Sequence, residues 1–109
     1  MALADVLAYR WGRLAGRLPD RLEDLRGPGQ GVVVLPVHLT WHGLREFDVA
    51  DGRLRLCLYS IVLSQGQRND IARFLNARLL TEDWPQLCGL LGRKTRAACE
   101  RRFGLTASG

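Results

Sequence analysis

The chain has 109 residues, which is enough for one domain with one modest hydrophobic core. Hydrophobic residues make up 47% of it and charged residues 25%, a globular composition that argues against disorder. Sixteen Lys and Arg against eleven Asp and Glu leave a formal net charge of +5, which suits an acidic protein surface or nucleic acid as the partner. So short a chain has little room for separate cofactor and substrate domains, and a binding or regulatory role is favoured over multi-step catalysis.

The first predicted element is a helix over residues 2–17. Apolar residues from Leu3 to Leu18 recur at steps of three and four, which is typical of one packed helix face. Arginines form a second stripe beside this face. The helix is expected either to pack with a solvated edge or to dock on a partner through a tryptophan anchor and an arginine rim. The partner-binding residues predicted here are Arg10, Trp11, Arg13 and Arg17.

The glycine-rich stretch that follows is interpreted as a boundary. Pro19 can begin a new helix, so residues 19–26 are predicted as a short helix with Gly27 as its C-terminal cap. A phosphate-binding loop needs a strand before its glycines and a helix after them, and here that order is reversed. We therefore interpret residues 27–31 as a turn and hinge. It separates an N-terminal helical arm, residues 1–26, from an α+β body, residues 27–109, within a single domain.

A short β-hairpin is predicted next. Residues 32–35 are a β-branched run typical of a strand, and residues 37–41 alternate and are expected to extend it as an edge strand. A two-residue turn at residues 42–43 would return the chain into a second strand over residues 44–49. Trp41 would then pack at the turn, or, if exposed, serve as a further partner-binding anchor.

The rest of the chain is predicted to be helical. The predicted helices span residues 53–63, 70–76, 81–91 and 93–103. Asp51 is the expected cap of the first, although alternating leucines leave a strand open as the competing prediction for its first half. Thr81 is the expected cap of the third, with Pro85 tolerated near its start. The fold class is therefore mainly α with a short β-hairpin (α+β), a small single domain of about five or six helices.

The three cysteines, Cys57, Cys88 and Cys99, form no CxxC pair, so neither a disulfide framework nor a zinc ribbon is expected. Cys57 and Cys88 stand among apolar residues and are interpreted as small core side chains. Reduced cysteines, together with Asp5 and Arg10 where a signal peptide would need an apolar run, indicate a cytoplasmic protein.

The two histidines, His38 and His42, lie about 13 Å apart if the chain between them is extended. Even with a nearby carboxylate such as Glu46, two histidines rarely complete a metal site. Neither has a serine or cysteine beside it in a recognisable nucleophile setting. The sequence therefore predicts no catalytic, cofactor-binding or metal-binding residue, and an enzyme is the less favoured class.

Two stretches could contact nucleic acid. Residues 71–87 imitate a helix-turn-helix, but their second helix begins with Glu82 and Asp83, which phosphates would repel. The C-terminal helix is the better candidate, because a basic patch can follow a phosphate backbone without reading sequence. The alternative is a solvated basic helix end. The predicted nucleic-acid-binding residues are Arg93, Lys94, Arg96, Arg101 and Arg102.

Four segments resemble a known family. They are residues 41–48 (WHGLREFD), 58–66 (LYSIVLSQG), 74–76 (FLN) and 84–87 (WPQL). Together they resemble the short actinobacterial antitoxins that partner nucleotidyltransferase toxins in systems of the mycobacterial MenAT type. The resemblance covers most of the chain after residue 31 and carries over no catalytic residue.

The resemblance implies a cytoplasmic protein that binds its cognate toxin and stops that toxin from transferring nucleotides to tRNA. Some antitoxins of this class are tied to phosphorylation of the toxin. This sequence lacks the glycine-rich, HRD-like and DFG-like motifs of a kinase, so phosphotransfer would have to be unconventional.

An antitoxin-like interaction protein is the first hypothesis. A small basic nucleic-acid-binding regulator and a phosphotransfer enzyme acting on its partner are the alternatives.

Overall fold

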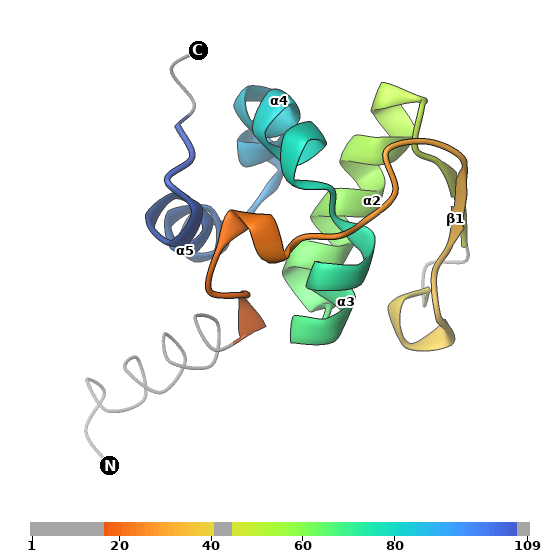
Figure 1. The fold of residues 1–109 in the computed structure, drawn as a ribbon, viewed down its shortest axis with the longest axis horizontal. Helices are drawn as coiled ribbons and strands as arrows, with labels where there is room; N and C mark the ends of the chain where they lie inside the picture. The colour runs from red at the N-terminus through yellow and green to blue at the C-terminus, as the bar shows by residue number, and fades with distance from the viewer. Residues whose placement is uncertain (1–16, 41–44, 107–109) are drawn as a thin grey trace.

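The computed structural model describes residues 17–40 and 45–106. Within them the chain is a mainly helical globule with one two-stranded antiparallel sheet, which confirms the mainly α class with a short hairpin (Figure 1). The described residues form four α-helices, where about five or six helices were predicted for the whole chain. The α-helices are α2 (Gly52–Gln65), α3 (Arg68–Phe74), α4 (Ala77–Leu87) and α5 (Arg93–Phe103). The strands are β1 (Val32–Val34) and β2 (Glu46–Asp48), and three 3-10 helices are η1 (Leu22–Asp24), η2 (Val37–Leu39) and η3 (Cys88–Leu90).

Helix α2 lies between the sheet on one side and α4 and α5 on the other (Figure 1). It is buried at Leu58, Tyr59, Val62 and Leu63, which recur at helical spacing. The helix begins at Gly52, so the competing prediction of a strand for its first half is wrong. The other large side chains with no exposed surface include Phe47 of β2, Leu80 and Trp84 of α4, and Leu35, Leu39, Ile71, Leu75 and Leu87. None of the described helices is long and apolar enough to cross a lipid bilayer.

The Asp51 cap of α2 and the end of α5 at Phe103 agree with the predictions. The Asp51 carboxylate accepts the backbone N–H of Arg53 at 3.0 Å, and so caps the first turn of α2. Gly66 ends that helix, with its N–H donating to the Val62 carbonyl at 2.8 Å. Gly104 ends α5 in the left-handed conformation, with φ of 67°. These stop signals are local, which is why the sequence was sufficient to find them.

The predicted helix over residues 19–26 is reduced to η1, and Gly27 is not its cap. Arg26 is extended and forms an antiparallel bridge with Asn76. The N–H of Gly27 donates to the Leu75 carbonyl at 2.7 Å. A Cβ atom at Gly27 would lie 2.4 Å from the carbonyl carbon of Phe74. This position needs glycine because two backbone segments approach closely there.

The predicted hairpin is correct in its first strand and wrong in its connection. Val33 pairs with Phe47, so the chain returns to β1 through residues 35–45 and not through a two-residue turn. The predicted extension of the first strand is instead η2, which turns Leu39 into the core. Pro36 precedes η2 and has no N–H to donate to a strand ladder. Residues 41–44, with the predicted turn at 42–43, lie outside the described residues.

Helix α4 begins earlier than predicted. The cap is Asn76, whose side-chain oxygen accepts the N–H of Leu79 at 3.1 Å, and not Thr81. Thr81 is inside the helix, where its hydroxyl donates to the Ala77 carbonyl at 2.9 Å. Pro85 consequently lies in the helix interior, and η3 follows directly after Leu87. Asn76 caps the helix because it also bonds to Tyr59 and Gly27, whereas Thr81 was predicted as the cap from its local sequence alone.

The described part of the predicted N-terminal arm packs on the rest of the molecule. Leu18 and Leu25 are buried in the core, and Arg17 donates from Nη1 to the Gly66 carbonyl at 2.8 Å. Residues 1–16, with most of the predicted first helix, lie outside the described residues. Of the predicted hinge, Gly27 is buried and residues 28–31 are exposed.

Candidate functional site

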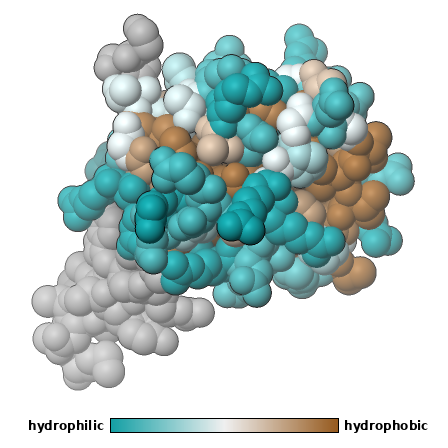
Figure 2. All heavy atoms as spheres, viewed as in Figure 1, coloured by the Kyte–Doolittle hydropathy of each residue, from teal (hydrophilic) through white to brown (hydrophobic). Residues whose placement is uncertain are grey.

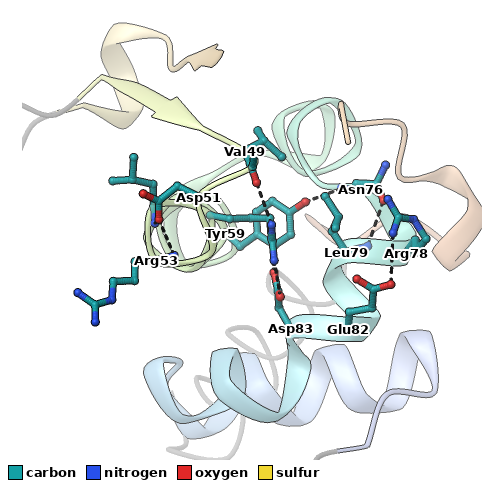
Figure 3. Close-up of polar contacts among 12 residues, drawn as sticks. Val49, Asp51, Arg53, Tyr59, Asn76, Arg78, Leu79, Glu82 and Asp83 are labelled. Carbon is teal, nitrogen blue, oxygen red and sulfur yellow. Dashed lines mark hydrogen bonds and ion pairs between the residues drawn. The ribbon is translucent and has the colours of Figure 1, made fainter. Parts of the chain in front are cut away.

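A buried polar pair joins α2 to α4 (Figure 3). Arg55 donates from Nη2 to Oδ1 of Asp83 at 2.8 Å, and from Nη1 to the Val49 carbonyl at 2.8 Å. The two side chains are only 15% and 11% exposed. Hydrogen bonding to Asp83 raises the pKa of the Arg55 guanidinium, which therefore stays charged. Arg55 also donates from Nε to Oδ2 of Asp83. Because three acceptor atoms receive its donors, Arg55 holds the end of β2, α2 and α4 together.

A second polar contact ties the start of α4 to the interior. The backbone N–H of Asn76 donates to Tyr59 Oη at 3.1 Å (Figure 3). The Asn76 side chain donates from Nδ2 to the Gly27 carbonyl at 3.0 Å. Burial raises the pKa of the Tyr59 phenol, so the hydroxyl stays protonated. Every buried side-chain N or O atom among the described residues has a hydrogen-bond partner. The polar groups of Tyr59 and Asn76 therefore stabilise the fold.

The contact between His38 and Asp70 imitates a catalytic pair. Its Nε2 lies 3.0 Å from Oδ2 of Asp70, and the His38 ring is exposed. The same carboxylate oxygen accepts the N–H of Gln67 at 2.9 Å at the start of α3. Asp70 therefore caps α3, and His38 adds a bond to that cap. No three His, Cys, Asp or Glu residues within the described ranges are grouped to hold a metal ion.

The cysteines divide differently from the prediction. All three are free thiols; Cys88 and Cys99 are buried, whereas Cys57 is exposed. The prediction for Cys57 was wrong because it lies on α2 beside the buried face of Leu58 and Tyr59, not within it. Burial raises the pKa of Cys99 to about 12, so this thiol stays protonated and unreactive at neutral pH.

Strand β1 and the neighbouring η2 carry three of the four large aliphatic residues that are exposed in the described part of the chain. Val32, Val34 and Val37 are 64%, 51% and 75% exposed. Figure 2 shows hydrophobic residues gathered at the side of the molecule where β1 lies. The register places Val32 beside Asp48 and Val34 beside Glu46, and both acidic residues are exposed. We call these five residues the sheet surface.

The sheet surface was not predicted. Its signal was the run Val32-Val33-Val34, because neighbouring residues of a strand point to opposite faces. Only Val33 points inward, as the exposed–buried–exposed pattern of β1 shows. With two strands and one helical layer on the inner side, the outer face of the sheet has no covering element among the described residues.

The predicted basic helix is only partly available to a partner. Arg96 pairs with Glu100 at 3.3 Å, and Arg102 pairs with Asp20 at 3.3 Å. The other three predicted residues, Arg93, Lys94 and Arg101, are exposed and have no acidic partner in the described part of the chain. Helix α5 lies at the opposite end of the molecule from β1 (Figure 1).

Of the predicted partner-binding residues, the structure describes only Arg17. Arg10, Trp11, Arg13 and Trp41 lie outside the described residues. Arg17 is half-buried and already donates to the Gly66 carbonyl.

No family model, no curated protein and no solved structure matches this chain.

Proposed function

We propose that this chain is an antitoxin-like protein that binds and neutralises a cognate nucleotidyltransferase toxin acting on tRNA. The observation that carries the proposal is the sheet surface, with Val32, Val34 and Val37 more than half exposed. Contiguous aliphatic residues in water are typical of a protein–protein contact. The interior, by contrast, has a filled core and partnered polar groups. The resemblance to antitoxins supplies the class of partner.

The proposed complex is a hetero-complex in the cytoplasm, where free thiols persist. The sheet surface makes the central contact. The predicted residues Arg10, Trp11, Arg13, Arg17 and Trp41 are proposed to extend it. Aromatic and arginine side chains are the usual anchors of such interfaces.

The test is co-expression with the protein encoded by the neighbouring gene. We expect the two proteins to co-purify, the growth defect caused by the neighbour to disappear, and its transfer of nucleotides to tRNA to stop in a purified assay. A neighbour that neither co-purifies nor loses its activity, with growth not restored, contradicts the proposed function.

Binding to nucleic acid is the second candidate, because α5 presents Arg93, Lys94 and Arg101 to solvent. Arg93 and Lys94 stand in the first turn of α5, where the partial positive charge of the helix terminus adds to their own. Affinity for a short duplex should fall steeply as salt rises. The Arg93→Glu/Arg101→Glu variant should bind more weakly, while Arg78→Glu on α4 serves as the control. Absent binding, or binding independent of salt, would remove this candidate.

A further inference from the structure

One side of β1 has backbone groups with no ladder partner among the described residues. The Leu35 N–H donates to the Arg45 carbonyl at 2.9 Å, and the Val49 N–H donates to the Gly31 carbonyl at 2.9 Å. Odd-numbered residues of the first strand therefore exchange hydrogen bonds with β2, since such pairs alternate along an antiparallel ladder. Val32 and Val34 consequently direct their N–H and C=O groups away from β2. The described sheet has no third strand on that side.

The side chains beside this open edge combine aliphatic and acidic character. Val32 and Val34 form an exposed aliphatic row, and the register places Asp48 and Glu46 in the next row. Neither carboxylate has a cationic partner within the described ranges. The face is thus locally acidic on a chain whose net charge is +5. Its charge complement is a basic segment.

We propose that the open edge of β1 accepts an added strand from the partner protein, and that this strand directs Arg or Lys side chains over the outer face of the sheet. The inference rests on the proposed function and adds the mode of binding and the chemistry of the partner segment. An added strand pairs with the free backbone groups of Val32 and Val34.

Spacing between strands supports a basic residue in the added strand. β2 lies two strand spacings, about 10 Å, from the added strand. A long basic side chain lays its aliphatic stem over Val32 and Val34 and brings its charged end toward Asp48 or Glu46. The same side chain covers the exposed valines and neutralises the carboxylates.

Two other occupants fit less well. A second copy of β1 would bring the segment Val32–Val34, which carries no cation for Glu46 and Asp48. Nucleic acid would bring phosphates next to the same two carboxylates, which repel them. Both occupants are distinguishable in the experiments below.

The first experiment measures the affinity of sheet variants for the neighbouring gene's protein. Val34→Lys and Glu46→Lys should each weaken binding at least tenfold. Leu90→Lys and Glu82→Lys are the matched controls, since Leu90 is also 59% exposed and Glu82 is an exposed carboxylate on α4. Both controls should stay within twofold of the wild type. Val34→Pro removes the N–H that faces the open edge together with the valine side chain, leaves the hydrogen bonds to β2 in place, and should weaken binding as much as Val34→Lys.

The second experiment reads the backbone directly. Amide hydrogen exchange of Val32 and Val34, measured by NMR on the full chain, should slow at least tenfold in the complex. If the complex forms but these amides are not protected, or if Val34→Lys and Glu46→Lys bind like the wild type, strand addition is wrong while toxin binding stands.

If no complex with the neighbouring gene's protein forms, the proposed function is contradicted. A third experiment then tests the open edge of β1 by itself. The probe is a synthetic peptide of alternating Arg and Val, with an alternating Glu and Val peptide as the control. Protection of Val32 and Val34 by the basic peptide alone supports the inference. Equal effects, or none, overturn it. Protection that instead grows with protein concentration as dimers form assigns the edge to a second copy and also overturns it.

Discussion

Gly27 lies against the backbone of Phe74 and Leu75, where a Cβ atom would come within 2.4 Å of a carbonyl carbon and oxygen. Its own N–H donates to the Leu75 carbonyl, and its carbonyl accepts from Asn76. A glycine that looked like a helix stop in the sequence is thus required by a contact between distant segments. At the scale of single residues, such backbone contacts decide which positions tolerate change.

Gly27→Ala should destabilise the protein by about 1–3 kcal/mol, because the methyl group meets backbone that cannot move aside cheaply. Gly29→Ala is the control, since its Cβ would lie 3.8 Å from the nearest side-chain atoms. The measurement is urea unfolding of both variants and the wild type. Equal midpoints for the two variants would contradict the close approach at Gly27.

Cys99 should make the protein less stable at alkaline pH. Burial raises its pKa from 9.0 to about 12, so the folded state keeps a proton that the unfolded state releases. The free energy of unfolding therefore falls as pH rises between about 9 and 12, by up to about 1.4 kcal/mol per pH unit from this group. Urea unfolding at pH 8 and pH 10 should show a smaller fall for Cys99→Ala than for the wild type. Cys57→Ala, at an exposed position, should keep the wild-type pH dependence.

At the scale of elements, α4 is held by polar groups at both its start and its middle. Asn76 caps it and also contacts Gly27 and Tyr59, while Asp83 pairs with Arg55 of α2. Its buried face includes Leu80 and Trp84, and the exposed face includes Glu82. On α4, Asp83 therefore joins the helix to α2 from the buried face, whereas Glu82 forms an ion pair with Arg78 on the exposed face.

Asp83→Asn should cost about 1–3 kcal/mol, because it leaves the half-buried charge of Arg55 without its counter-ion. Glu82→Gln, in the exposed pair with Arg78, should cost less than about 1 kcal/mol. Urea unfolding of the two variants checks this difference. The double variant Arg55→Met/Asp83→Leu should lose less stability than the sum of the losses of Arg55→Met and Asp83→Leu, and additive losses would contradict a coupled pair.

At the scale of the whole molecule, the charged and aliphatic surfaces are separated. The sheet surface lies at one end, beside α2, and α5 with its exposed Arg93, Lys94 and Arg101 lies at the other (Figure 1). Figure 2 shows the hydrophobic residues concentrated on the sheet side of this view. This separation would allow the proposed protein partner and the proposed nucleic acid to bind at the same time.

The two surfaces should therefore act independently. Val34→Lys should weaken binding of the protein partner and leave duplex binding unchanged, whereas Arg101→Glu should do the opposite. Effects in the double variant should add, because sites this far apart share no contacts. Titrations of both partners against the four proteins check this. A loss of both activities from Val34→Lys alone, with the fold intact by circular dichroism, would contradict it.

The sequence was sufficient where the signal lay within a few residues. Asp51 before a helical run, Gly104 after one, and the β-branched run of β1 were each recognisable from their neighbours. It misplaced the start of α4 and the connection from β1 to β2. Thr81 and Asn76 are both residue types that cap helices, so their neighbours in the sequence do not distinguish them. Only Asn76 also forms hydrogen bonds with Tyr59 and Gly27.

The sequence by itself determined the class of protein: a small, basic, mainly helical chain with one short hairpin and no recognisable catalytic motif. Spacing of apolar residues and local capping chemistry are sufficient for that. Only the tertiary structure decided that Val32 and Val34 face solvent, that Asp48 and Glu46 lie beside them, and that Arg55 meets Asp83. These contacts depend on strand register and on helix packing. A pattern along the sequence determines neither the register nor the packing.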